Sequence, residues 1–294
     1  HAAELLADVR ETCALLRAQF PAARFLAFWD FDGTLLRGDC TEGYAERGRE
    51  VYPGLARLAI ARGLSADYPV EGGYAAWKDD YAELKRRVGP WLAYPWIAQV
   101  WAGAEEAALQ ELARQHFSVT LSRHYFAASR LWFDGLAADG VEQHVISASP
   151  EVFVRGAAAS LGIAPERIHG IRVRATDGRL TREVLYPVPF GEGKLARLHE
   201  IVRASQAESP LQPVFVIAAF GNDFVTDGPF AAFVARHVLP TGTPLAVMIN
   251  AGLAPAEYRH VFRSVRQARI FARKSSCGTV TLPSWWPHCF SSDT

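Results

Sequence analysis

The sequence has no excess of charge of either sign, because 31 Lys and Arg residues balance 31 Asp and Glu residues among 294. A nucleic acid or an anionic membrane surface as partner would favour a clear excess of basic residues. No apolar run approaches the roughly 20 residues that a membrane-spanning helix needs. We therefore expect a soluble protein whose partners are neither nucleic acid nor membrane.

Cysteine is scarce, with four residues at Cys13, Cys40, Cys277 and Cys289. They form no Cys-x-x-Cys pair and have no nearby His at zinc-finger spacing, which argues against a structural zinc. A disulfide between Cys277 and Cys289 stays open, although free buried cysteines are common. The chain begins at His1 rather than Met. We favour a cytoplasmic location, while removal of an export signal would place the protein in the periplasm or outside the cell.

What the sequence does contain is a series of apolar runs, and half of its residues are hydrophobic. Continuous apolar runs indicate strands that are buried on both faces, as in a parallel sheet. Helical patterns separate these runs, and an Asp-Gly pair at 177–178 between β-rich runs favours a hairpin. The alternation predicts an α/β fold with a parallel sheet. The predicted strands of the sheet cover residues 26–29, 141–147, 214–220 and 245–249.

Residues 37–122 differ from the rest, because no comparably clear buried strand occurs there. The pattern is helical and rich in Tyr and Trp, and Gly and Pro interrupt it at several points. We expect several short helices that form a second domain, with most of the aromatic side chains in its core.

Two acids, Asp30 and Asp32, directly follow the first predicted strand. In open α/β sheets the ligand binds at the carboxyl ends of the strands, so both carboxylates are expected at a binding edge. Carboxylates that lie this close repel each other, and a bound cation usually offsets the repulsion. Gly33 permits a tight turn, and the Thr34 hydroxyl can bond locally or contact an anion.

Three later stretches also place polar residues at the ends of predicted elements. Ser147 closes the second strand, Lys194 begins a helix, and the segment 221–227, here called the acidic motif, follows the strand that ends at Phe220. A phosphate beside two carboxylates needs compensating charge, which a lysine at a helix N-terminus supplies.

Together with Asp30-Phe-Asp-Gly-Thr-Leu35, these stretches resemble, in the same order, the motifs of the haloacid dehalogenase-like (HAD) phosphohydrolase superfamily. The resemblance covers about residues 24–249 and is strongest to the phosphoserine phosphatase-like branch. It implies a Rossmann-like three-layer core with a parallel sheet and an inserted, mostly α-helical cap. The implied boundaries are 1–38 and 123–294 for the core and 39–122 for the cap.

The resemblance also implies a Mg²⁺-dependent phosphomonoesterase. Asp30 would attack phosphorus to form an aspartyl-phosphate, and Asp32 would protonate the leaving alcohol and then activate water. Ser147 and Lys194 would complete the catalytic set by binding and neutralising the phosphoryl group. Mg²⁺ would be held by Asp30, by the backbone carbonyl of Asp32 and by the acidic motif. The implied substrate-binding positions are Gly33, Thr34, Asp39, Arg87 and Ala148.

The acidic motif departs from the usual pattern, because Asn222 stands where the family places an Asp. Asp227 is the expected second acid, and Asp223 offers an alternative to Asn222 as a metal ligand. An Asn ligand would lower the charge of the site and its affinity for Mg²⁺. The choice between Asn222 and Asp223 stays open at this point.

The expected substrate is a small phosphorylated metabolite, with an amino acid phosphate or an amino-alcohol phosphate favoured. Asp39 and Arg87 would suit an ammonium and a carboxylate. However, the acidic motif with Pro229 behind it looks more like that of phosphocholine phosphatases, and aromatic side chains can bind a quaternary ammonium. A phosphotransferase would share every motif, and a binding protein that kept the fold but lost the chemistry is a further alternative. A dehalogenase is disfavoured because it does not need Asp32 as a proton donor.

Overall fold

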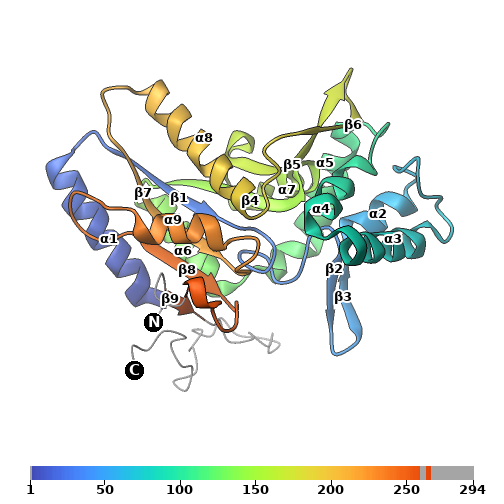
Figure 1. Ribbon diagram of the computed structural model, residues 1–294, viewed down its shortest axis with the longest axis horizontal. Helices are drawn as coiled ribbons and strands as arrows, with labels where there is room; N and C mark the ends of the chain where they lie inside the picture. Colours follow the sequence, from blue (N-terminus) through green and yellow to red (C-terminus); the bar gives the residue numbers. More distant parts are fainter. Residues whose placement is uncertain (1, 259–262, 266–294) are drawn as a thin grey trace. The chain divides into compact units, whose positions relative to one another are not determined.

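The computed structural model describes residues 2–258 and 263–265, and within these the chain forms two compact units (Figure 1). Unit 1 consists of the described parts of 1–35, 125–145 and 194–294. Unit 2 consists of residues 36–124 and 146–193. Each unit is therefore assembled from segments that are separated in the sequence.

Unit 1 is built on parallel strands. Strand β1 (Arg24–Trp29) pairs with β4 (Glu142–Pro150) on one side and with β7 (Val214–Gly221) on the other. Strand β8 (Leu245–Ile249) follows β7, β9 (Arg263–Val265) follows β8, and all of these pairings are parallel. The partner of Trp29 in the register is Phe220. Both strands therefore end at the same edge, and the residues that follow them meet there.

The helices of unit 1 are α1 (Ala2–Gln19), α6 (Ala127–Ala138), α8 (Glu192–Glu208) and α9 (Gly228–Arg236). Helix α1 packs against α6, and α9 packs against β7 and β8. A short 3₁₀ helix, η4 (Ala256–Tyr258), follows β8. Trp29 stacks on Phe220 with ring centroids 3.7 Å apart, and Trp132 of α6 lies 5.6 Å from the same ring. Aromatic packing thus fixes the ends of β1 and β7 beneath the edge that carries the acids.

Unit 2 contains mainly helices. They are α2 (Leu55–Ala61), α3 (Gly73–Val88), α4 (Pro90–Gln99), α5 (Glu106–Val119), α7 (Glu151–Ala157) and the 3₁₀ helices η1 (Leu121–His124), η2 (Ala158–Leu161) and η3 (Pro165–Arg167). Helix α5 packs closely against α7 at Gly156, where an added Cβ would lie 2.4 Å from Cβ of Ala113. A side chain at this glycine would therefore force the two helices apart.

Two antiparallel hairpins complete unit 2. The first joins β5 (Ile168–Thr176) to β6 (Arg179–Leu185), with Asp177 and Gly178 in the turn at φ of 50° and 75°. This hairpin confirms the prediction from the Asp-Gly pair. The second joins β2 (Gly43–Glu46) to β3 (Arg49–Pro53), and the sequence analysis did not include it. Its strands are short, and Tyr52 is their one buried residue, so they lack the apolar run that marks a buried strand.

The predicted α/β class, with a mostly parallel sheet and a helical insertion, is confirmed. Compact unit 2 includes residues 146–193 in addition to 36–124, whereas the prediction placed 146–193 in the core. The assignment of 39–122 as the cap stays a prediction.

Cys13 and Cys40 are buried and free. The Cys277–Cys289 disulfide that the sequence left open lies outside the described residues. Within the described part of the chain, no helix combines the length and the apolar character that crossing a membrane requires.

Candidate active site

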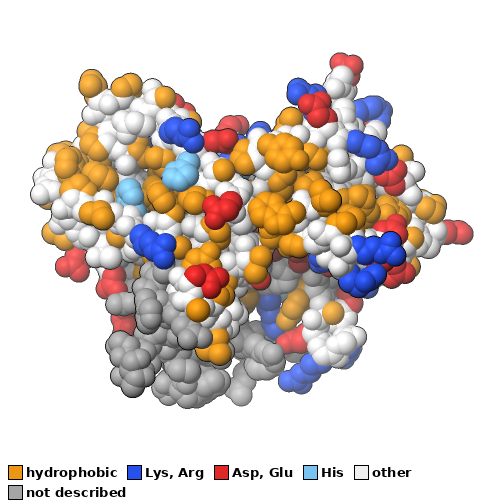
Figure 2. Space-filling model, viewed as in Figure 1, with side chains coloured by type: hydrophobic (Ala, Val, Ile, Leu, Met, Phe, Trp, Pro, Cys, Tyr) orange, Lys and Arg blue, Asp and Glu red, His pale blue; other side chains and the backbone are white. Residues whose placement is uncertain are grey.

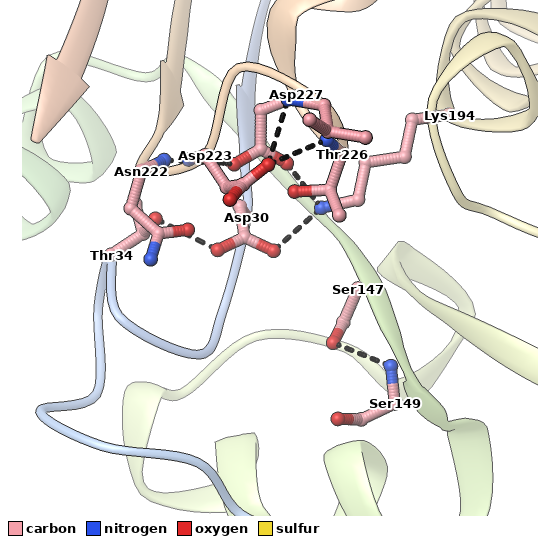
Figure 3. A network of polar contacts seen from close by, with 10 residues as sticks. Asp30, Thr34, Ser147, Ser149, Lys194, Asn222, Asp223, Thr226 and Asp227 are labelled. Atoms are coloured by element: carbon pink, nitrogen blue, oxygen red, sulfur yellow. Dashed lines mark hydrogen bonds and ion pairs between the residues drawn. The ribbon is translucent and has the colours of Figure 1, made fainter. Parts of the chain in front are cut away.

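Three charged side chains meet in unit 1 at the carboxyl edge of the sheet (Figure 3). Asp30 directly follows β1, Lys194 lies in the first turn of α8, and Asp227 directly precedes α9. The Lys194 ammonium donates to Oδ1 of Asp30 and to Oδ1 of Asp227, both at 2.6 Å. All three side chains are buried, and Lys194 and Asp227 are fully inaccessible. Hydrogen bonds this short between ionised groups are strong, so the cluster is rigidly held.

The electrostatics of the cluster favour a further cation. Burial, followed by the nearby Asp227 carboxylate, raises the pKa of Asp30 to about 7, although Lys194 and Thr34 act in the opposite direction. Burial lowers the pKa of Lys194, but the carboxylates of Asp227 and Asp30 outweigh burial and raise it overall. Lys194 is therefore charged at neutral pH. One ammonium facing two carboxylates leaves negative charge that a bound cation would offset.

Thr34 orients the Asp30 carboxylate. Its hydroxyl donates to Oδ2 of Asp30 at 2.8 Å, so each oxygen of this carboxylate has a donor within the cluster. Ser129 of α6 in turn donates its hydroxyl to the backbone carbonyl of Thr34 at 2.6 Å. This second bond holds the loop that follows Asp30 against the helix beneath it.

Asn222 packs directly on the loop that follows Asp30. Gly33 in that loop has φ of 75°, and a Cβ added there would lie 2.0 Å from Nδ2 of Asn222. Figure 3 shows the Asn222 side chain facing the Asp30 carboxylate. Two reasons therefore favour glycine at position 33: its backbone is left-handed, and a side chain there would collide with the Asn222 amide.

The carboxylates of the acidic motif are engaged with its own backbone. Oδ2 of Asp227 accepts the backbone N–H groups of Asn222 at 2.8 Å and Asp223 at 3.0 Å, while its Oδ1 binds Lys194. Oδ1 of Asp223 accepts the N–H groups of Val225 and Thr226, and the residue is exposed. Asp227 thus shapes the loop and holds the lysine, and Asp223 forms a turn.

Asp32, Ser147 and Ala148 are also among the predicted site residues. Asp32 is partly exposed in the loop after β1. Ser147, in unit 2, is buried, and its Oγ accepts the N–H of Ser149 at 3.1 Å, with Ala148 between them.

The two predicted contacts to the substrate leaving group also belong to unit 2. Oδ1 of Asp39 accepts the N–H groups of Thr41 and Glu42, both at 2.7 Å. Arg87 is 70% exposed and pairs with Glu83 one helical turn away on α3. Unit 1 therefore brings together Asp30, Gly33, Thr34, Lys194, Asn222 and Asp227, and the roles of all the predicted site residues remain predictions.

Two residues of the site escaped the sequence analysis. Ser129 is fully buried on α6 beneath Thr34, and the ring of Phe230 on α9 lies 5.7 Å from the Lys194 ammonium. A single serine or phenylalanine on an amphipathic helix carries no local signal of such a role. Both were identifiable only from their three-dimensional neighbours.

The family model described as haloacid dehalogenase-like hydrolase matches residues 27–223, which is more than half of the chain. The protein belongs to this family. No curated protein sequence matches the chain.

Several solved structures resemble the fold at low sequence identity. A protein of unknown function from Bordetella pertussis Tohama I has a TM-score of 0.60 and 17% identity, with 80% of this chain and 93% of that chain covered. A cytosolic 5'-nucleotidase IIIB bound to cytidine has a TM-score of 0.51 and 14% identity, with coverage of 90% and 86%. A functionally unknown protein from Anaerococcus prevotii has a TM-score of 0.50 and 12% identity, with coverage of 80% and 81%. These similarities establish the fold and leave the substrate open.

Proposed function

We propose that this protein is a Mg²⁺-dependent phosphomonoesterase that acts through an aspartyl-phosphate on Asp30. The observation that carries the proposal is the buried cluster of Asp30, Lys194 and Asp227 at the carboxyl edge of the sheet. Membership of a hydrolase family adds support. A carboxylate that is held by a lysine and a hydroxyl is a suitable nucleophile toward phosphorus, because its orientation is fixed before the substrate arrives.

In the proposed reaction, an oxygen of Asp30 forms a bond to phosphorus as the bond from phosphorus to the substrate alcohol breaks. Asp32 gives its proton to the departing alkoxide and then accepts a proton from the water that attacks the aspartyl-phosphate. Phosphate leaves and the Asp30 carboxylate is restored. Lys194 offsets negative charge beside Asp30, and Ser147 donates a hydrogen bond to a phosphoryl oxygen.

The residues around Asp30 fit Mg²⁺, which prefers oxygen ligands and would help neutralise the phosphoryl oxygens. Asp30 and Asn222 would supply side-chain oxygens, and Asp32 its backbone carbonyl. Between Asn222 and Asp223 we favour Asn222, because its amide packs against Gly33 in the loop that follows Asp30, whereas Oδ1 of the exposed Asp223 accepts two N–H groups of its own turn. Asp227 stays the expected acid of the motif. The neutral amide predicts weaker Mg²⁺ binding than a carboxylate would give at this position.

The favoured substrate is a small phosphorylated amino acid or amino alcohol, with Asp39 facing the amine. Arg87 is the weaker part of the proposed contact to the leaving group, because it is exposed and already pairs with Glu83. The Tyr81 ring already has the Lys85 ammonium 4.1 Å from its centroid, so a cation–π site for a quaternary ammonium would use other aromatic rings of residues 44–101. Asp39 therefore carries the substrate proposal, with phosphoserine and phosphocholine both to be tested.

The test is hydrolysis of p-nitrophenyl phosphate with and without Mg²⁺ by the wild type, by Asp30→Asn and by the control Asp79→Asn, which removes an exposed carboxylate from α3. Activity should require Mg²⁺, persist in the control and vanish in Asp30→Asn. The Asn variant should stay folded, because it relieves the repulsion between Asp30 and Asp227. Substantial turnover by Asp30→Asn would refute the assignment of the nucleophile.

The same assay separates the alternatives. Phosphoserine, phosphoethanolamine, phosphocholine and glycerol phosphate should be compared by kcat/KM in the wild type and in Asp39→Asn. A preference for glycerol phosphate that is insensitive to Asp39→Asn would remove the amine-recognition proposal alone. Transfer of phosphate to an added alcohol in preference to water would identify a phosphotransferase, and phosphate binding without turnover a binding protein.

A further inference from the structure

Unit 1 contains a cavity of about 480 Å³ between α1 and the segment that leads into β8. This volume lies in the range of small-molecule pockets. Its lining includes Leu245, which begins β8, whereas Asp30 and Asp227 follow the carboxyl ends of β1 and β7. Asp30, Lys194 and Asp227 are here called the catalytic cluster. Because these strands are parallel, the cavity lies toward the opposite edge of the sheet from this cluster.

One wall of the cavity is held by hydrogen bonds. The Thr12 hydroxyl donates to the backbone carbonyl of Thr243 at 3.1 Å and accepts the N–H of Thr243 at 3.3 Å. Gly242 has φ of 73°, and a Cβ added there would lie 2.7 Å from Cγ2 of Thr12. The absence of a side chain at Gly242 thus lets the segment approach α1, and the wall exists without a ligand.

The α1 side of the cavity carries two acids, Asp8 and Glu11, which are exposed and lie three residues apart on one helix face. Neither carboxylate has an ion-pair partner among residues 2–258 and 263–265. The basic side chains of α1 are engaged elsewhere, since Arg10 pairs with Asp139 and Arg17 bonds to the carbonyl of Asp139. Figure 2 shows acidic side chains over α1. The cavity lining contains no Lys or Arg among the described residues.

The remaining lining is largely apolar and comes from Val9, Leu15, Ala235, Pro244 and Leu245. Leu15 is 44% exposed, so part of this surface faces solvent. An anion would meet two carboxylates without a compensating cation, and a hydrated metal ion would leave the apolar wall uncovered. A ligand with ammonium groups on a short hydrocarbon skeleton matches both parts of the lining.

We propose that this cavity binds a small organic amine, with its ammonium groups paired to Asp8 and Glu11 and its hydrocarbon skeleton against the apolar wall. The proposal does not depend on the phosphatase activity, because it uses no residue of the catalytic cluster. It assigns unit 1 a second binding site for a cationic metabolite.

The test is calorimetric titration of the full chain with 1,5-diaminopentane, with pentane-1,5-diol as the neutral probe of the same length. The double variant Asp8→Asn/Glu11→Gln should bind the diamine about tenfold more weakly, as expected when two exposed ion pairs are lost. The matched control Glu71→Gln/Asp79→Asn removes two exposed acids from unit 2 and should bind as the wild type does. Binding should also weaken as ionic strength rises.

The location of binding is tested separately. The diamine should slow amide hydrogen exchange in residues 8–15 and 242–246, and Asp30→Asn should bind it with unchanged affinity. Weaker binding by Asp30→Asn would place the amine at the catalytic cluster and overturn the proposal. Absence of saturable binding, equal affinity of the double variant and the wild type, or equally tight binding of the diol would overturn it as well.

Discussion

Lys194→Met removes the ammonium that Asp30 and Asp227 share, while it keeps a side chain of similar length. In the native protein this ammonium is fully buried and donates two bonds of 2.6 Å. Its removal leaves two buried carboxylates that face each other without a cation. Breaking a buried ion pair in this way typically costs about 3 to 5 kcal/mol, which is a large part of the roughly 5 to 15 kcal/mol that stabilises a domain.

The loss should depend on pH, because Asp30 can take up a proton. In the metal-free protein the folded-state pKa of Asp30, about 7, lies above the ordinary value of 3.8 for an aspartic acid, so the contribution of this residue to stability falls as pH rises through that interval. Lys194 lowers this pKa, and the variant should therefore raise it further. We expect a larger loss at pH 8, where both carboxylates are charged, than at pH 5.5, where Asp30 is neutral.

The assay is urea unfolding in the presence of a chelator at both pH values, in a double-mutant cycle with Asp227→Asn. Because Asp227→Asn removes the repulsion that Lys194→Met exposes, the double variant should lose about 1 to 3 kcal/mol less than the sum of the single losses. Lys78→Met, at an exposed position of α3, is the control and should change stability by about 0.5 kcal/mol or less. A loss below about 1 kcal/mol at pH 8, or additive losses, would refute the electrostatic account.

Three further predictions concern the residues around Asp30. Gly33→Ala should displace the Asn222 amide and lower both stability and Mg²⁺ affinity. The control Gly48→Ala, at nearly the same positive φ but with no atom within 4 Å of an added Cβ, should cost only the backbone strain of about 1 to 2 kcal/mol. Equal losses of stability in urea unfolding would contradict the packing argument. Asn222→Asp should tighten Mg²⁺ binding in calorimetry, and Asp223→Asn should leave it nearly unchanged; the reverse order would identify Asp223 as the ligand. Asp32→Asn should reduce kcat/KM far more for alkyl phosphates than for p-nitrophenyl phosphate, whose leaving group hardly needs a proton; equal reductions would remove the acid role.

The sequence by itself determined the class of the fold and the edge of the sheet at which the acids gather. Leu26 to Trp29 form a continuous apolar run, and only a strand covered on both faces buries such a run efficiently. The position of Asp30 directly behind that run follows from the same local pattern. The hairpin at Asp177 and Gly178 was equally predictable, since its turn needs a left-handed backbone that this pair readily adopts.

Only the tertiary structure decided which polar side chains of the cluster contact one another. Lys194 is 164 residues from Asp30 in the sequence and 33 from Asp227, so no local pattern predicts that one ammonium bonds to both. The sequence left Asn222 and Asp223 as equal candidates for the metal ligand. The folded loop shows only their different surroundings, since Asp223 bonds to its own backbone while Asn222 packs on Gly33, and our preference for Asn222 is a proposal based on this difference. Local periodicity records which face of an element is buried, whereas contacts between distant side chains exist only once the elements have packed.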